Sequence, residues 1–190
     1  MPHADSSLLP AEVTTRAQLW AHIYEQLELL IEGQRQWVSN LANASSLIYH
    51  SLASFSEFGT GESAVNWAGF YLSSELFPHA QPTSTPTLLL GPFSGRPACQ
   101  FIRAQAGKGV CADAYVTKQT VLVRDVDSYA GHIACDGATK SEIVVPVFKG
   151  GEGEVVGVLD LDCLKLGGFD EVDREGVERI AGLLGRGCDW

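Results

Sequence analysis

The chain has 190 residues, of which 45% are hydrophobic and 19% charged, and its formal net charge at pH 7 is −10. This length and apolar content suit one folded domain with a sizeable core, and they argue against a disordered chain. The acidic balance argues against nucleic acid and anionic membranes as partners, because both carry negative charge.

The chain begins with a polar, proline-bearing segment, residues 1–13, which we expect to be flexible. It lacks the basic and apolar regions of a signal peptide, and no run of about 18 apolar residues follows, so we predict a cytoplasmic protein without a membrane span. Residues 14–190 are expected to form one domain. Apolar residues recur at spacings of three and four from Thr14 to Gly33 and from Val38 to Leu52, which predicts two helices.

Five later segments are rich in β-forming residues and are expected to be strands: residues 65–72, 87–93, 120–124, 142–148 and 155–164. The first two are predicted to form a long hairpin with a variable Pro/Thr/Ser loop at residues 77–86, and the last two form a second hairpin around residues 150–154. The turn Gly107–Gly109 is expected to open a short helix through Cys111, and a closing helix begins at Asp170. Helices followed by hairpin-linked strands predict an α+β domain with an antiparallel sheet.

Aromatic residues gather on one face of the first predicted strand. Alternation places Trp67, Gly69 and Tyr71 on this face, with Asn66 and Phe70 on the opposite one. Two aromatic rings with room above the glycine would suit an apolar or cationic ligand. Ordinary packing of core aromatics is the alternative interpretation, and it is the more common one.

Acidic residues gather on the last predicted hairpin. Alternation places Asp160 and Asp162 on one face with Val156 and Val158, and Glu142 opens the neighbouring strand. A solvated face is the usual reason for such acids, but the valines indicate that this face is partly covered. Covered like charges raise one another's pKa or require a cation. The three acids therefore suit a metal ion or an organic ammonium.

Three of the five cysteines, Cys99, Cys111 and Cys135, lie in or beside glycine-rich segments. An odd and sparse set of cysteines is not typical of a secreted disulfide scaffold, and in a reducing compartment such residues pack in the core, react or bind metal. Cys135 lies in the non-periodic segment 125–139, and this polar, open surrounding makes it our predicted nucleophile. Cys111 is the alternative, because a helix start and Lys108 favour its thiolate.

The same three thiols form a Cys₃His set with His132, which has the composition of a structural zinc site. Such sites usually contain two cysteines separated by two to four residues, and this spacing is absent from the sequence. We therefore expect no metal, and zinc remains an alternative interpretation.

Six strings of the sequence, NWAGFY, GPFSGRPAC, GKGVC, GHIACDG, KSEIVVP and GVLDLDC, resemble the free methionine-(R)-sulfoxide reductases, which are single-domain GAF proteins. The resemblance covers about residues 34–188. It implies a central six-stranded antiparallel sheet with helices on both faces, and a homodimer. It further implies reduction of free L-methionine-(R)-sulfoxide, without metal or organic cofactor, with thioredoxin as the reductant.

The resemblance also implies which residues form the site. The family's three cysteines match Cys99, Cys111 and Cys135. Its substrate-binding residues match Trp67, Tyr71, Glu142, Asp160 and Asp162. Cys111 follows Cys99 by twelve positions, two more than is typical of the family. A non-catalytic GAF module that binds a small ligand or senses redox state is the alternative function.

Overall fold

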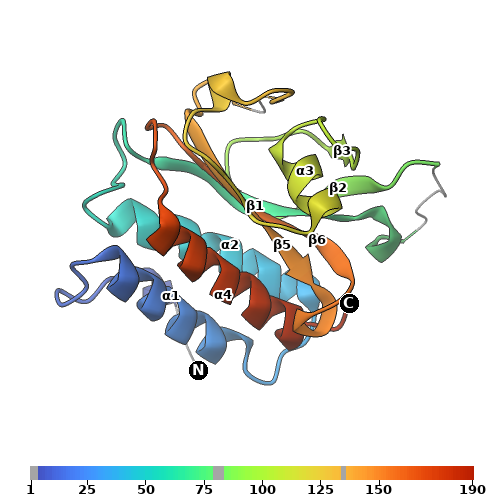
Figure 1. Cartoon of the computed structure of the whole chain (residues 1–190). Helices are drawn as coiled ribbons and strands as arrows, with labels where there is room; N and C mark the ends of the chain where they lie inside the picture. Colours follow the sequence, from blue (N-terminus) through green and yellow to red (C-terminus); the bar gives the residue numbers. More distant parts are fainter. Residues whose placement is uncertain (1–3, 79–83, 134–135) are drawn as a thin grey trace.

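The computed structural model describes residues 4–78, 84–133 and 136–190, which contain an antiparallel sheet covered by helices on both faces (Figure 1). The strands are β1 (Val65–Ser73), β2 (Thr87–Gly95), β3 (Phe101–Arg103), β4 (Val121–Val123), β5 (Ser141–Phe148) and β6 (Val155–Cys163). Their order across the six-stranded sheet is β3-β2-β1-β6-β5-β4. The predicted fold class and both predicted hairpins are confirmed.

Helices α1 (Arg16–Ile31), α2 (Trp37–Ser54) and α4 (Glu171–Gly187) lie on one side of the sheet, and α3 (Val110–Thr117) lies on the other (Figure 1). Helices α2 and α4 contact the strands, and α1 packs against both of these helices. Short 3-10 helices are η1 (Ala4–Ser7), η2 (Ser74–Leu76), η3 (Val126–Ser128) and η4 (Lys149–Gly151). The four α-helices confirm the two helices predicted from periodicity, the short helix predicted after the Gly107–Gly109 turn and the closing helix.

The two faces of the sheet have different roles. On the side of α2 and α4, alternate residues such as Phe70 and Leu159 are fully buried and belong to the main hydrophobic core. The opposite face carries a smaller cluster that includes Trp67, Tyr71 and Cys111. One face therefore supplies most of the apolar burial, and the other is free to build a site under α3.

A β-bulge changes the predicted alternation at the start of β1. The pairing of β1 with β6 shifts between Val65 and Trp67, which makes Asn66 the additional residue. Its side-chain amide donates to Asp136 Oδ2 at 3.2 Å and to Thr139 Oγ1 at 3.1 Å. The expectation that Asn66 shares a face with Phe70 is therefore wrong, because the bulge turns it toward the 136–139 segment.

A second irregularity lies where β6 begins. The pairing of β5 with β6 shifts between Val147 and Phe148, and Val156 packs in the core on the helix side. Val158 alone of the two valines shares the face of the acids. Strand β3 was not predicted, because three residues at a sheet edge are too few to show a periodic pattern.

The amino-terminal segment contains η1, and Leu9 and Val13 pack against the main core. The flexibility of residues 1–13 and the domain boundary at residue 14 stay predictions. Among the described residues, none of the helices combines the length and apolar character that crossing a membrane requires.

Asp173 joins α4 to α1 from a fully buried position. Its carboxylate accepts hydrogen bonds from Arg16 Nη1 and from Trp20 Nε1, the latter at 2.9 Å. Asp173→Ala leaves both donors without this acceptor, so we expect the free energy of unfolding to fall by about 3 kcal/mol. Urea denaturation measures the change. Glu171→Ala, which removes an exposed acid from the same turn, should change it by less than about 1 kcal/mol, and equal losses would contradict the prediction.

Candidate active site

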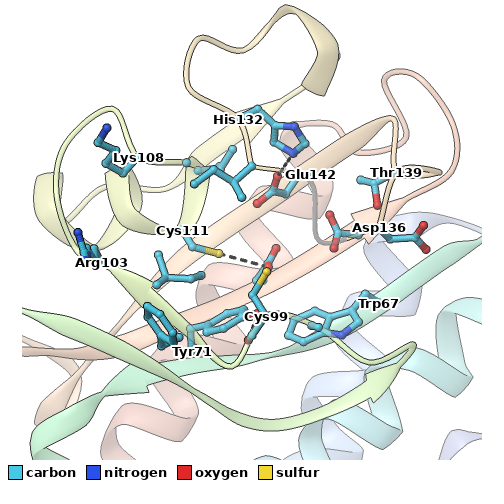
Figure 2. A pocket seen from close by; sticks show the side chains of 18 of the residues that line it. Trp67, Tyr71, Cys99, Arg103, Lys108, Cys111, His132, Asp136, Thr139 and Glu142 are labelled. Carbon is cyan, nitrogen blue, oxygen red and sulfur yellow. Dashed lines mark hydrogen bonds and ion pairs between the residues drawn. The ribbon is translucent and has the colours of Figure 1, made fainter.

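A cavity of about 460 Å³ lies between the sheet and α3 (Figure 2). This volume is within the range of small-molecule sites. Strands β1, β5 and β6 form its base, and residues from the segments 96–111, 132–133 and 136–139 form its walls. The seven predicted site residues that the structure describes all line it: Trp67, Tyr71, Cys99, Cys111, Glu142, Asp160 and Asp162. Cys135 lies outside the described residues.

Trp67 and Tyr71 form an aromatic base for the cavity. Both are almost fully buried, and their rings stack with centroids 5.9 Å apart. Trp67 also stacks with Phe93, with centroids 5.4 Å apart. A Cβ atom at Gly69 would overlap the Trp67 ring and Phe93, so the space predicted above this glycine is filled by the indole itself. The glycine allows Trp67 to lie flat on the sheet.

Strand register places the acids beside these rings. Strand β6 lies between β1 and β5, and Asp162 is opposite Trp67 on one side and Glu142 on the other. Asp160, two residues before Asp162 on β6, is opposite Gly69 of β1. Glu142 and Asp160 are each only 5% exposed, so the prediction of a covered acidic face is confirmed.

Burial is the main cause of unusual acidity in this cluster. It raises the pKa of Asp160 and Asp162 well above the usual range, and neighbouring carboxylates raise both further. It also raises the pKa of Glu142 to about 7, although His132 partly offsets the shift. Asp160 Oδ1 is buried and finds no hydrogen-bond partner among the residues that the structure describes. Without a cationic partner these carboxyl groups favour their neutral forms, whereas a cationic ligand would favour the ionised ones.

These raised pKa values predict that the protein loses stability as pH rises when no ligand is added. The native state keeps the Asp162 proton at pH values where the unfolded chain has lost it, so the native state binds more protons and the free energy of unfolding falls above about pH 4. Asp162→Asn removes this titration. We expect the free energy of unfolding of the variant, relative to that of the natural protein, to increase as pH rises from 4 to 8. Denaturation of both proteins at the two pH values measures this difference. A gain that is equal at both would contradict the prediction.

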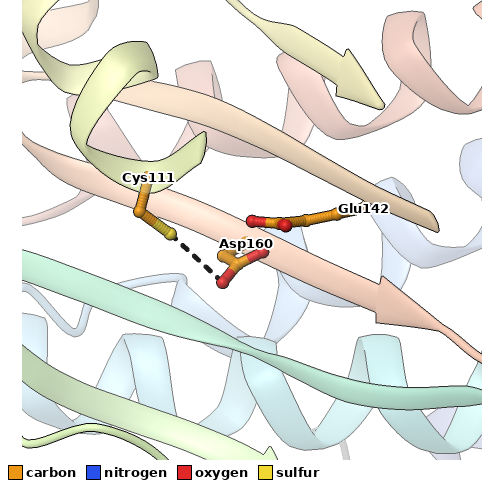
Figure 3. A group of neighbouring side chains, drawn as sticks. All are labelled: Cys111, Glu142 and Asp160. Carbon is orange, nitrogen blue, oxygen red and sulfur yellow. Dashed lines mark hydrogen bonds between the residues drawn. The ribbon is translucent and has the colours of Figure 1, made fainter. Parts of the chain in front are cut away.

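Cys111 lies in the first turn of α3, after the N-cap Gly109, as predicted. Its Sγ donates a hydrogen bond to Asp160 Oδ2 at 3.3 Å (Figure 3). Burial raises the pKa of the Cys111 thiol well above its usual range, and the charges of Asp160 and Glu142 raise it further. The predicted preference of Cys111 for the thiolate is therefore wrong, because desolvation and these acids outweigh the helix start and Lys108.

The segments that carry the other two cysteines meet at the cavity. The half-buried Cys99 lines it, and the Cys99 carbonyl accepts a hydrogen bond from the Tyr71 hydroxyl at 2.9 Å. Ile133 and Asp136, the nearest described residues before and after Cys135, also line it.

Asp113 on α3 joins these two segments. Its carboxylate accepts a hydrogen bond from the backbone N–H of Gly107 at 2.6 Å and one from the Tyr129 hydroxyl at 2.8 Å. The backbone N–H of His132 in turn donates to the Tyr129 carbonyl at 3.1 Å. The turn before α3 and the loop after η3 are therefore held together.

One group of side chains has the composition of a cation site. Cys111, Glu142 and Asp160 each offer a ligand atom, and these atoms lie within 4.8 Å of one another (Figure 3). This group differs from the Cys₃His set considered above, because it contains two acids and only one of those cysteines. Its thiol already donates to Asp160, so hydrogen bonding accounts for the Cys111–Asp160 contact.

Comparison with known proteins agrees with this geometry. A GAF domain family model matches residues 52–187. The free methionine-R-sulfoxide reductase of Saccharomyces cerevisiae is 49% identical over 170 residues, which cover 87% of this chain and 86% of the relative. The chain belongs to the free methionine-R-sulfoxide reductase family of GAF domains.

Two further members of the free methionine-R-sulfoxide reductase family support this assignment. The Escherichia coli reductase is 34% identical over 89% of this chain and 88% of its own length. The X-ray structure of the Neisseria meningitidis reductase in complex with its substrate matches with a TM-score of 0.78 at 33% identity, and the match covers 95% of each chain.

Sequence reasoning missed several residues of the cavity that this reductase fold assembles. His132 was considered only as a zinc ligand, yet its Nε2 lies 3.5 Å from Glu142 Oε2. Asp136, Thr139 and Arg96 also line the cavity, and Arg96 Nη1 lies 3.4 Å from Asp136 Oδ2. The strings GHIACDG and GPFSGRPAC contain three of these four residues and were the signal that could have found them.

Proposed function

We propose that this protein reduces free L-methionine-(R)-sulfoxide to L-methionine. The observation that carries the proposal is the set of buried carboxyl groups beside an aromatic base in one cavity. The family supports it, because the yeast and E. coli relatives are free methionine-R-sulfoxide reductases and the N. meningitidis structure holds its substrate.

The acids provide a reason for preferring a free amino acid. A free substrate carries an α-ammonium, which Asp160 and Asp162 would bind through charge-assisted hydrogen bonds while their pKa values fall. A methionine sulfoxide residue within a protein has an uncharged amide at this position. Binding it would leave buried acids without a cation, at a cost of several kcal/mol. Selectivity for the free amino acid then needs no steric barrier.

The aromatic base suits the other end of the substrate. Trp67 and Tyr71 present flat apolar surface on which the S-methyl group can pack, with the sulfoxide oxygen directed to the acids. Contact on one side of a chiral sulfur distinguishes its two epimers. We propose that Trp67 makes this contact and thereby selects the R epimer.

The reaction requires a thiolate and an acid. We propose that the Cys135 thiolate attacks the sulfoxide sulfur while Glu142 protonates the oxygen, so that methionine leaves and Cys135 becomes a sulfenic acid. Cys99 or Cys111 then condenses with the sulfenic acid, which releases water and forms a disulfide. Thioredoxin reduces this disulfide by exchange. The raised pKa of the Cys111 thiol supports Cys135 as the first nucleophile.

A coupled assay tests the proposed function. The protein is incubated with racemic free methionine sulfoxide, thioredoxin, thioredoxin reductase and NADPH, and the two epimers are followed by chromatography. We expect NADPH loss with consumption of the R epimer alone, and no reaction with a peptide that contains methionine sulfoxide. Ligand binding without NADPH loss would instead indicate a non-catalytic GAF module. Light scattering of the purified protein alone gives its mass in solution and tests the proposed homodimer.

A further inference from the structure

His132 is a polar residue of the cavity that the proposed reaction has not used, and its side chain pairs with the proposed acid, Glu142. It comes from the loop after η3, and its imidazole lies above Glu142 at the cavity wall (Figure 2). His132 Nε2 is 3.5 Å from Glu142 Oε2, and the two side chains are 14% and 7% exposed. The pair therefore joins a carboxyl group inside the cavity to an imidazole at its edge.

The position of His132 is fixed independently of Glu142. Its backbone N–H donates to the Tyr129 carbonyl, and the Tyr129 hydroxyl is held by Asp113 on α3. Gly131, immediately before it, has a positive φ of +82°, and a Cβ there would overlap the Gly107 carbonyl oxygen. The loop is thus packed closely on the turn before α3, and it presents the imidazole to Glu142 from a fixed backbone.

We propose that His132 is a positioning residue for the proposed reaction, which orients the Glu142 carboxyl group in the cavity and returns to it the proton that each turnover consumes. This inference rests on the proposed function. In each turnover the proton of Glu142 goes to the sulfoxide oxygen and leaves as part of water when the disulfide forms. The proton released by the Cys135 thiol balances it, and His132 provides the route back to Glu142.

The surrounding charges agree with this role. Its hydrogen bond to Glu142 raises the pKa of His132 and Asp127 raises it further, and together they outweigh burial, which lowers it. The imidazole therefore keeps its proton to higher pH than an ordinary histidine does. In the opposite direction His132 lowers the pKa of Glu142, which burial and Asp162 raise. Asp160, Cys111 and Tyr129 also interact electrostatically with Glu142. Further charged residues that line the same cavity are Arg96, Arg103, Lys108 and Asp136.

The first experiment tests the pair without requiring activity. Imidazole titrations are followed by NMR in the natural protein and in Glu142→Gln. We expect the His132 midpoint to lie above its ordinary value and to fall in the variant, because the carboxylate that favours the imidazolium has been removed. His50, an exposed histidine of α2, gives the internal reference. A His132 midpoint that does not move would overturn the pairing.

The second experiment tests the role in turnover. His132→Gln keeps an amide donor at the Nε2 position but cannot carry a charge, and His132→Ala removes both. We expect kcat to fall by about tenfold in the alanine variant and less in the glutamine variant. In both variants the alkaline limb of the pH–rate profile should move to higher pH, because Glu142 loses the neighbour that lowers its pKa. His50→Gln should leave rate and profile unchanged.

The outcomes separate the two proposals. Lower rates with an unmoved alkaline limb would mean that His132 is only structural, and would overturn this inference while leaving the reductase proposal intact. No turnover by the natural protein would overturn both the proposed function and the catalytic use of His132, whatever the NMR titration shows.

Discussion

Cys135→Ser should abolish reduction of free methionine-(R)-sulfoxide, with a fall in kcat of at least about a thousandfold. A serine hydroxyl is not ionised near neutral pH, and it cannot form the sulfenic acid on which the later steps depend. Turnover is measured with dithiothreitol as reductant, so that thioredoxin recognition does not contribute. A single-turnover assay that counts methionine per protein measures the first step directly.

The other cysteines give the matched controls. Cys99→Ser and Cys111→Ser should still release one equivalent of methionine in a single turnover, because either residue acts only after the sulfenic acid has formed. The Cys188 thiol, at the end of α4, does not line the cavity, and Cys188→Ser should turn over like the natural protein. If Cys111→Ser loses the first equivalent and Cys135→Ser keeps it, the nucleophile assignment is wrong.

Asp162→Asn should raise KM for the free substrate by about 10- to 100-fold, with a smaller effect on kcat. The asparagine removes a charge-assisted hydrogen bond to the α-ammonium, and such bonds contribute roughly 1.5–3 kcal/mol. Steady-state kinetics at saturating reductant measure both constants. Equal KM values for the variant and the natural protein would argue against an ammonium at this carboxyl group.

A substrate analogue makes this test specific. N-acetyl methionine sulfoxide has an amide in place of the ammonium, so the natural protein should strongly prefer the free amino acid over it. Asp162→Asn should lose part of this preference, because its own amide side chain no longer requires a positive partner. The unfolding measurements at pH 8 described above show in parallel that the variant is folded. Unchanged discrimination between the two substrates would contradict the proposed basis of selectivity.

The same carboxyl groups lower the stability of the fold while they allow the site to bind an ammonium group. Asp160 is buried and Asp162 is partly buried on the sheet face opposite the main core, where their ionised forms are disfavoured without a cationic partner. A ligand that supplies an ammonium removes this penalty, so it should stabilise the protein most at high pH. The acidic cluster is therefore better explained by a role in ligand binding than by a contribution to folding stability.

Much of the site could be predicted from local sequence. A period of two places Trp67 with Tyr71, and Asp160 with Asp162, on single faces of their strands, and the structure confirms both pairs. The glycine turn before Cys111 predicted a helix start, which is also confirmed. These predictions succeed because each depends only on residues that are neighbours along the chain.

The predictions that failed concern contacts between distant segments. The bulges at Asn66 and Val156 arise where strands pair, and no local pattern marks them. The acidity of Cys111 was wrongly predicted from its helix start, because the decisive groups, Asp160 and Glu142, come from strands 31 or more residues further along the chain. The same holds for His132, whose role depends on its approach to Glu142.

The sequence by itself therefore determined the elements other than β3, the strand faces that carry the aromatic and acidic residues, and the family. Only the tertiary structure decided that the aromatic and acidic faces meet in one cavity, that Cys111 is held as a thiol, and that His132 pairs with Glu142. The physical reason is that alternation along a strand is a local property. Burial, cross-strand register and pKa depend instead on which distant residues the completed fold brings together.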